Sequence, residues 1–175
     1  MSKFLRMTAV AATMAAALSA TSATAATSVS ATTNANAHAK IMKPLQIAGT
    51  QDLDFGTLVI SGTGTQTMHV DQTGALTGCA AVITCSGTPQ AAVYNVKGTP
   101  NATVKVTVAS PVTLTNANDG TTLDLTPDAP STVSLDTSAA STGDNFNIGG
   151  SITIDSAATT DGVYSGTFAV SVDYQ

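Results

Sequence analysis

The sequence predicts an all-β protein, an antiparallel β-sandwich, and three observations support this class. The chain has 175 residues with no Glu, no Trp and only six Lys and Arg, so the straight-chain residues that favour helices are scarce. Thr, Val, Gly and Asp are abundant, and these residues favour strands and turns. Apolar and polar residues alternate along many short stretches, with turn signals between them at regular spacing. This spacing is typical of a sandwich of about eight to ten strands rather than of a parallel sheet.

The expected strands begin at a segment that contains Pro44. Because proline lacks a backbone N–H, this stretch is expected to be an edge strand or the start of a strand. The later stretches are bounded by Gly, Pro, Asn or Asp, which favour turns. The alternating stretches are 40–47, 52–60, 65–70, 91–96, 102–109, 112–116, 121–126, 131–136, 145–155 and 161–175.

Two of these stretches carry the clearest patterns. Val104, Val106 and Val108 fall on one face of a strand and alternate with polar residues, which indicates a half-buried strand. Asn118–Gly120 has the composition of a hairpin turn and separates two alternating stretches. The sequence therefore predicts a hairpin between residues 112 and 126.

Glycines are expected to disturb two other stretches. Gly56 is expected to form a bulge in the stretch 52–60. Gly149 and Gly150 are expected to break the stretch 145–155, whose apolar residues are otherwise in phase. In the first of these stretches, one face is expected to carry Leu53, Phe55 and Val59, and the other Leu58.

Residues 1–25 are expected to form a secretory signal peptide. Lys3 and Arg6 give a positive start, an Ala-rich apolar run follows, and Ala23-Thr24-Ala25 fits a cleavage site with small residues. The apolar run is shorter than the roughly 20 residues that cross a bilayer. The sequence therefore predicts export to the periplasm, the cell surface or the extracellular space.

The exported chain is expected to have two parts. Residues 26–39 are rich in Thr, Ala and Asn and read as a flexible N-terminal arm, and residues 40–175 as the β-sandwich domain. The net charge is −5, and few Lys or Arg are present. This balance argues against nucleic acid and anionic membranes as partners. No segment after the signal peptide is expected to insert into a membrane.

Cys79 and Cys85 are the only cysteines, and an even count in an exported protein favours a disulfide. The spacing between them matches no usual zinc site, and no His lies near them in the sequence. The predicted bond is a local staple on a hairpin or loop.

The sequence holds no recognisable catalytic constellation. His69 is expected to point outward from a strand, and His38 lies in the arm, so neither is placed to activate a nucleophile. The Asp residues lie mostly in turns, where Asn and Asp are favoured in any case. The protein is therefore expected not to be an enzyme and to need no cofactor or metal.

The domain resembles the domain-of-unknown-function 4402 family of exported bacterial proteins. The stretches that carry the resemblance are "KIMKPLQIAGTQDLDFGTLV", "AAVYNVKGTPNATVKVTV" and "FNIGGSITID…DGVYSGTFAVSVDYQ". The resemblance implies an exported β-sandwich whose function is largely unassigned.

The final stretch is also similar to the last strand of chaperone–usher pilus subunits. Those subunits have an immunoglobulin-like sandwich that lacks one strand, and they end on an alternating strand. The similarity implies that the β-sandwich of this protein is also immunoglobulin-like. Gly162 is the fourteenth residue from the end of this sequence and Tyr174 is next to last, as in those subunits. The strand-pairing residues that the similarity implies are Gly162, Tyr164, Phe168, Val170, Val172 and Tyr174.

The same similarity implies partners and a donor strand. A periplasmic chaperone and an usher would act during export, and a strand from the arm of a neighbouring subunit would complete the sandwich in trans. The arm has the alternation of a donor, but its side chains are small and bury little area. A linker left by signal processing is the alternative reading. The donor-arm residues would be Val29, Ala31, Ala35, Ala37, Ala39 and Ile41.

Two functions follow from these features. The first is a non-catalytic surface subunit of a pilus or fimbria, which associates with its own copies or with other surface subunits. The second is a self-contained secreted sandwich that binds a glycan or an envelope protein. Aromatic residues make up only 4% of the chain, and Tyr94 is the only one expected outside the core pattern. Few aromatic side chains are therefore expected to be available for stacking against sugars.

Overall fold

A computed structural model describes residues 28–30 and 32–175, and its strands all lie in the unit Lys40–Gln175. Residues Met1–Ala39 form a separate unit. Its described residues are exposed and contain no strand. The predicted signal peptide, residues 1–25, lies outside the described residues, and the division of the chain into signal peptide, arm and domain stays a prediction.

Thirteen strands make up the described part of the domain. The strands are β1 (Gln46–Gln51), β2 (Thr57–Ile60), β3 (Thr65–Val70), β4 (Leu76–Thr77), β5 (Ile83–Ser86), β6 (Ala92–Lys97), β7 (Thr103–Val108), β8 (Val112–Asn116), β9 (Thr122–Asp128), β10 (Thr132–Ser134), β11 (Asp144–Asp155), β12 (Tyr164–Ser165) and β13 (Val170–Tyr174).

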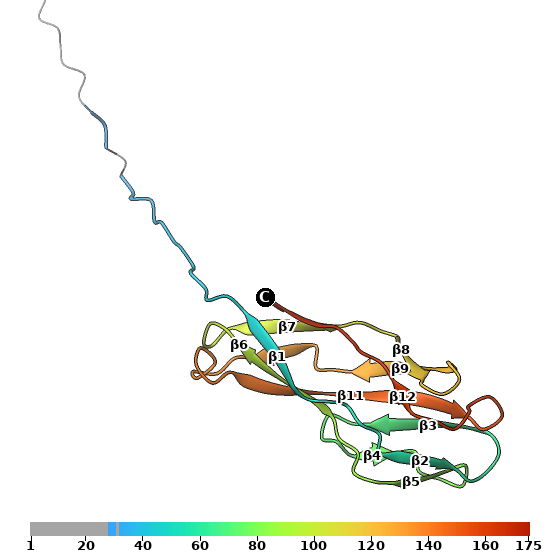
Figure 1. The fold of residues 1–175 in the computed structure, drawn as a ribbon. Helices are drawn as coiled ribbons and strands as arrows, with labels where there is room; N and C mark the ends of the chain where they lie inside the picture. The colour runs from blue at the N-terminus through green and yellow to red at the C-terminus, as the bar shows by residue number, and fades with distance from the viewer. Residues whose placement is uncertain (1–27, 31) are drawn as a thin grey trace, which may run out of the picture. The chain divides into compact units, whose positions relative to one another are not determined.

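The largest sheet is organised around β11. Its strand order is β1-β6-β11-β9-β8-β12, and β3 also pairs with β11 and carries β4. The first half of β11 pairs with β6, and its second half pairs with β3 and β9 (Figure 1). Each of these pairings is antiparallel, and the hairpin predicted around Asn118–Gly120 is confirmed as β8–β9.

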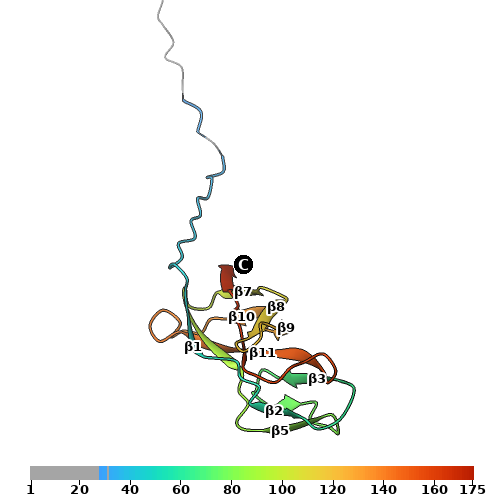
Figure 2. The same ribbon diagram turned by 45° about the vertical axis from the view of Figure 1, so that its right-hand side comes forward.

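Two smaller sheets complete the domain. One has the order β10-β7-β13, and the other is the hairpin-like pair β2-β5. Figures 1 and 2 show β2 and β5 beside β3, away from β7 and β10. The described residues thus form an all-β fold of antiparallel sheets, consistent with a β-sandwich, as predicted. The immunoglobulin-like strand arrangement stays a prediction.

The core consists of two apolar clusters. The first joins β6, β7 and β11 through side chains such as Val96, Val104 and Ile148, each fully buried. The second joins β3, β5 and β11 through side chains such as Met68 and Ile83. Alternation explains this arrangement, because every second residue of a strand faces the same side. The predicted shared face of Val104, Val106 and Val108 is confirmed, since all three pack in the first cluster.

The prediction that Gly149 and Gly150 break a strand is wrong. β11 runs without interruption from Asp144 to Asp155, and its apolar residues stay in phase across the two glycines. A Cβ on Gly149 would meet the backbone of Val70, and one on Gly150 would lie 2.7 Å from the Leu125 side chain. The glycines therefore permit close packing where β11 changes partners, which is the other role that glycine has within strands.

Two predictions about side-chain direction are also wrong. Val59 is 50% exposed, whereas Leu58 packs against the second cluster. Gly56 has φ +71°, so the chain turns there and the alternation shifts by one residue before β2. Tyr94 was expected outside the core pattern, but its ring stacks on Phe146 with 5.8 Å between ring centroids.

Candidate strand-pairing interface

The final stretch, residues 161–175, forms two strands rather than the single strand that the pattern predicts. Tyr164 and Ser165 pair with β8, whereas Val170–Tyr174 pair with β7 in a different sheet. Gly162 and Phe168 lie outside both strands. Phe168 packs against both core clusters at the crossing between the sheets.

β13 is the edge strand of its sheet. Among the described residues it pairs only with β7, in a register from Val170↔Val108 to Tyr174↔Val104. Its inward-facing side chains remain partly exposed, whereas Val104 on the neighbouring strand is fully buried. Burial therefore decreases from the centre of this sheet towards the edge that β13 forms. The inward-facing residues of β13 are Val170, Val172 and Tyr174.

Tyr174 connects β13 to two other segments. Its hydroxyl donates a hydrogen bond to the Lys43 carbonyl at 2.7 Å and accepts one from the Thr99 N–H, also at 2.7 Å. The Lys43 N–H in turn donates to Thr99 Oγ1 at 2.6 Å. These bonds fix the end of β13 to the segment before β1 and to the turn after β6.

Gly98 makes this arrangement possible. A Cβ built on Gly98 would lie 2.6 Å from the Tyr174 hydroxyl, 2.8 Å from a Leu45 methyl and 2.9 Å from a Leu135 methyl. Real Cβ atoms do not approach other atoms so closely, so any larger residue would displace these groups. The sequence marks residues 97–101 as a turn but carries no signal that Tyr174 binds there.

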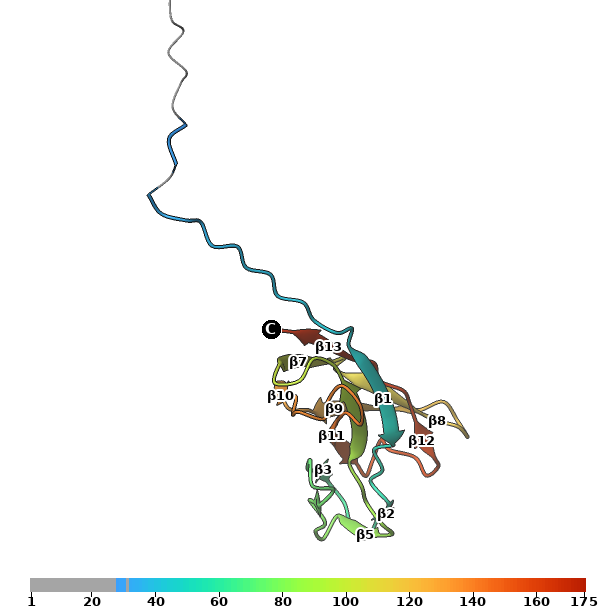
Figure 3. The same ribbon diagram turned by 90° about the vertical axis from the view of Figure 1, so that its left-hand side faces the viewer.

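β1 is a second edge strand close to β13. Among the described residues it pairs only with β6, and its register shifts between Gly49 and Gln51. Leu45 and Ile47 are partly buried and pack against the first cluster, as the side chains of β13 do. Figure 3 shows β13 beside the start of β1, in agreement with the Tyr174–Lys43 hydrogen bond. The predicted edge position is confirmed for β1, but the predicted stretch 40–47 is only partly a strand, because residues 40–45, Pro44 included, lie before β1.

Local packing explains why residue 162 is a glycine. Its φ is +148°, and a Cβ there would collide with the side chain of Asn116. Asn116 is buried, and its amide donates to Thr160 Oγ1 at 3.2 Å and to the Asp161 carbonyl at 3.0 Å. Gly162 is therefore required for the packing of this loop on β8, whatever partner β13 has.

The loop beside β12 also holds a carboxylate in a hydrogen-bond network. The pKa of Asp119 lies below its usual value because the Thr160 hydroxyl, and then the Thr121 N–H and hydroxyl, donate hydrogen bonds to its carboxylate. The Tyr164 hydroxyl donates to the Thr160 carbonyl at 2.9 Å. These bonds order the hairpin β8–β9 and the loop before β12.

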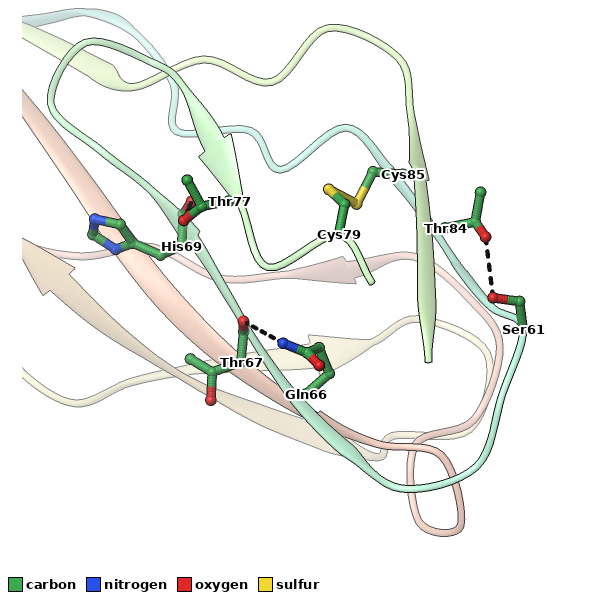
Figure 4. The surroundings of a disulfide bond; sticks show 8 residues. All are labelled: Ser61, Gln66, Thr67, His69, Thr77, Cys79, Thr84 and Cys85. Carbon is green, nitrogen blue, oxygen red and sulfur yellow. Dashed lines mark hydrogen bonds between the residues drawn. A yellow bond between two sulfur atoms is a disulfide. The ribbon is translucent and has the colours of Figure 1, made fainter. Parts of the chain in front are cut away.

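The predicted disulfide between Cys79 and Cys85 is present, with 5.7 Å between the two Cα atoms. Cys85 lies in β5, and Cys79 lies between β4 and β5 (Figure 4). Ala80 and Ile83 exchange two backbone hydrogen bonds, of 3.1 Å and 3.0 Å, inside the loop that the disulfide closes. The bond is thus a local staple that fastens the start of β5, as predicted.

The large apolar side chains among the described donor-arm residues are strongly exposed. Val29 is 94% exposed and Ile41 is 91% exposed. Ala35, Ala37 and Ala39 are also exposed, and Ala31 lies outside the described residues. Among the described residues, the side chains of Val29 and Ile41 are therefore almost uncovered.

The histidine on β3 is half-buried rather than fully solvated. His69 Nδ1 lies 2.9 Å from Ser151 Oγ, and the two residues are directly opposite in the β3–β11 register. In the described part of the chain, no acidic side chain hydrogen-bonds to His69. Residues 28–30 and 32–175 contain no group of three or more His, Cys, Asp or Glu that could hold a metal ion.

The fold and this geometry define an all-β domain with two open strand edges on neighbouring sheets. The family model described as Domain of unknown function (DUF4402) matches residues 45–174, so the chain belongs to that family. In the same comparisons, no curated protein and no solved structure matches the chain. Within the described residues, no helix has the length and apolar character needed to cross a membrane.

Proposed function

We propose that the protein is a non-catalytic, exported surface subunit that assembles by addition of a β-strand to the edge of β13. The single observation that carries the proposal is the coincidence of an unpaired strand edge with inward side chains that are only partly buried. A strand added to such an edge would form backbone hydrogen bonds and cover the exposed part of the core. An open edge without a natural partner is a hazard for non-specific aggregation.

The donor would be the N-terminal arm of a neighbouring copy, residues 26–39 continued to Ile41. The exposed side chains of Val29 and Ile41 support this assignment, since covering them would remove apolar area from water. The Cys79–Cys85 disulfide is consistent with assembly outside the cytoplasm, where disulfides persist.

The test is the oligomeric state of the exported protein on denaturing gels without boiling. We expect a ladder of oligomers that disappears when residues 26–41 are deleted. Ala35→Asp with Ala37→Asp should also remove the ladder, because both residues would face the acceptor. Asn36→Ser with His38→Ser is the matched control, on the opposite face of the arm, and should keep the ladder. A monodisperse monomer from the unaltered protein would refute the proposal.

Export partners form a separate part of this proposal. A periplasmic chaperone and an usher would bind β13 before assembly, so substitution of its inward face should reduce the amount of exported protein. We expect Phe168→Asp and Tyr174→Ala to stop export or chaperone capture, while Ser171→Asp, on the outward face of β13, leaves both intact. Normal secretion of Phe168→Asp and Tyr174→Ala would count against a chaperone.

A second function is favoured by one specific observation. The hydrogen bonds of Tyr174 to Lys43 and Thr99 connect the two open edges through residues of the same domain. This closure is the feature expected of a self-contained sandwich, which would then bind a glycan or an envelope protein. Refolding of the chain alone to a stable monomer would favour this second function over strand addition.

A further inference from the structure

A small pocket lies where the start of β1 meets the end of β6, two strands that Figure 1 shows side by side. Its volume is about 160 Å³. Pockets for drug-sized ligands usually measure about 300–1,000 Å³, so this space suits an ion or one small chemical group. The pocket is lined by Lys43, Pro44, Gln46, Lys97, Gly98 and Ala140.

Positive charge is concentrated at this pocket. The chain has six Lys and Arg, of which Lys3 and Arg6 lie in the predicted signal peptide. Two of the other four, Lys43 and Lys97, line this one pocket, and no acidic residue lines it. The chain as a whole carries a net charge of −5, which disfavours anions elsewhere on its surface. Two like charges around one small space repel each other, and an anion between them would be attracted by both.

The backbone at both lysines is fixed by contacts within the domain. The Lys43 N–H donates a hydrogen bond to Thr99 Oγ1 at 2.6 Å, and the Lys43 carbonyl accepts one from the Tyr174 hydroxyl at 2.7 Å. Lys97 lies directly opposite Gln46 in the β1–β6 register, so their side chains share one face of the sheet. The two lysines thus start from fixed positions, which reduces the entropy lost when a ligand binds.

The uncharged lining residues add hydrogen-bond donors. The exposed Gln46 carries an amide that makes no hydrogen bond within the described residues, and the Ala140 N–H donates none there either. Oxygens of an anion accept strong hydrogen bonds from ammonium groups and further ones from amides.

We propose that this pocket binds a small oxyanion, a phosphate or a carboxylate group, between Lys43 and Lys97. Lysine binds such groups as a point charge, so either group is accepted. The group is a free ion or the end of a larger molecule that stays outside the pocket. The proposal does not depend on strand addition, because no residue of β13 lines the pocket.

The experiment titrates inorganic phosphate, and separately succinate, into the purified protein by isothermal titration calorimetry at low ionic strength, where charges are least screened. This measurement serves a monomer and an oligomer alike. We expect saturable binding of at least one of the two anions. Lys43→Gln and Lys97→Gln should each weaken it at least about tenfold, because each removes a charge-assisted hydrogen bond. The hydrogen bonds of Lys43 to Thr99 and Tyr174 use its backbone, so the substitution leaves them in place.

Lys105→Gln is the matched control, because Lys105 is an exposed lysine on β7 that does not line the pocket. It removes the same charge and should leave the affinity unchanged. Gln46→Glu is a second test at an exposed position, and it should abolish binding by adding a negative charge to the lining. Circular dichroism checks that each variant is folded.

The outcomes separate the two kinds of group and the failure of the proposal. Saturation by phosphate alone assigns the pocket to a phosphate group, and saturation by succinate alone assigns it to a carboxylate. If neither anion binds the unaltered protein, the proposal is wrong. If Lys105→Gln weakens binding as much as Lys97→Gln does, the lysines attract anions only diffusely, and the pocket is not a binding site.

Discussion

The Tyr174 hydroxyl donates a hydrogen bond of 2.7 Å to the Lys43 carbonyl, and this contact joins the edge strand β13 to the segment that leads into β1. The same hydroxyl accepts a hydrogen bond from the Thr99 N–H. The Tyr174 hydroxyl therefore links the edge strand β13 to the segment that precedes the other edge strand, β1. Its role can be separated from the packing of the ring, because phenylalanine retains the ring and lacks the hydroxyl.

Tyr174→Phe is expected to lower the free energy of unfolding by about 1–3 kcal/mol, since two hydrogen bonds are each worth about 0.5–1.5 kcal/mol. Urea denaturation followed by circular dichroism measures this change. Tyr94→Phe is the control, because the Tyr94 ring packs in the core but its hydroxyl makes no hydrogen bond among the described residues. Equal midpoints for the two variants would show that the Tyr174 hydroxyl contributes nothing.

Gly98→Ala should destabilise the same region by a steric mechanism. The added methyl would lie within 3 Å of Tyr174, Leu45 and Leu135, and overpacking of this kind typically costs about 1–3 kcal/mol. The measurement is again the urea midpoint. Gly49→Ala is the matched control on β1, because its nearest contact would be 3.4 Å, to the Tyr94 ring. A Gly98 variant as stable as the Gly49 variant would contradict the close approach.

The sequence predicted the fold class and the hairpin β8–β9 because both depend on local signals. The scarcity of helix formers and the turn at Asn118–Gly120 act within a few residues. The disulfide was also predictable, because the chain holds only Cys79 and Cys85. The family resemblance rested on longer stretches, and the match to residues 45–174 confirms it.

The errors concern contacts between residues far apart in the sequence. A period-two pattern cannot show that residues 161–175 change sheets, because the alternation of Tyr164 and Val170 is the same in either sheet. Nor does the pattern show that Gly149 allows the backbone of Val70 to approach β11 closely, instead of interrupting the strand. The bonds of Tyr174 to Lys43 and Thr99 span 131 and 75 residues. Such contacts depend on the packed arrangement of the sheets, which short-range patterns do not determine.

Reduction of the Cys79–Cys85 disulfide is expected to lower stability without abolishing the fold. The two residues are six apart, and closure of so short a loop restricts the unfolded chain by about 2 kcal/mol. β5 is also held by Ile83, which is fully buried in the second cluster. Thermal unfolding with and without a thiol reductant measures the difference, and Cys79→Ala with Cys85→Ala, which should be insensitive to reductant, is the control. Complete unfolding on reduction at room temperature would contradict this expectation.

The stability of the domain should fall in acid partly through Asp119. Its pKa in the folded chain is depressed below the usual 3.8, chiefly by the hydrogen bond from Thr160, so the folded state favours the ionised carboxylate. The resulting stabilisation is present above the unfolded pKa and is lost as the pH falls through the folded pKa. Asp119→Asn should therefore be less stable than the unaltered protein at neutral pH. The difference should shrink as the pH is lowered below about 3.8.

The measurement is a series of urea midpoints between neutral pH and the acid limit of the folded state. Asp124→Asn is the matched control on the same hairpin, because Asp124 is exposed and its side chain makes no hydrogen bond among the described residues. Its midpoint should run parallel to that of the unaltered protein across the series. A constant difference between Asp119→Asn and the unaltered protein at every pH would show that Asp119 acts through the geometry of its hydrogen bonds and not through its charge.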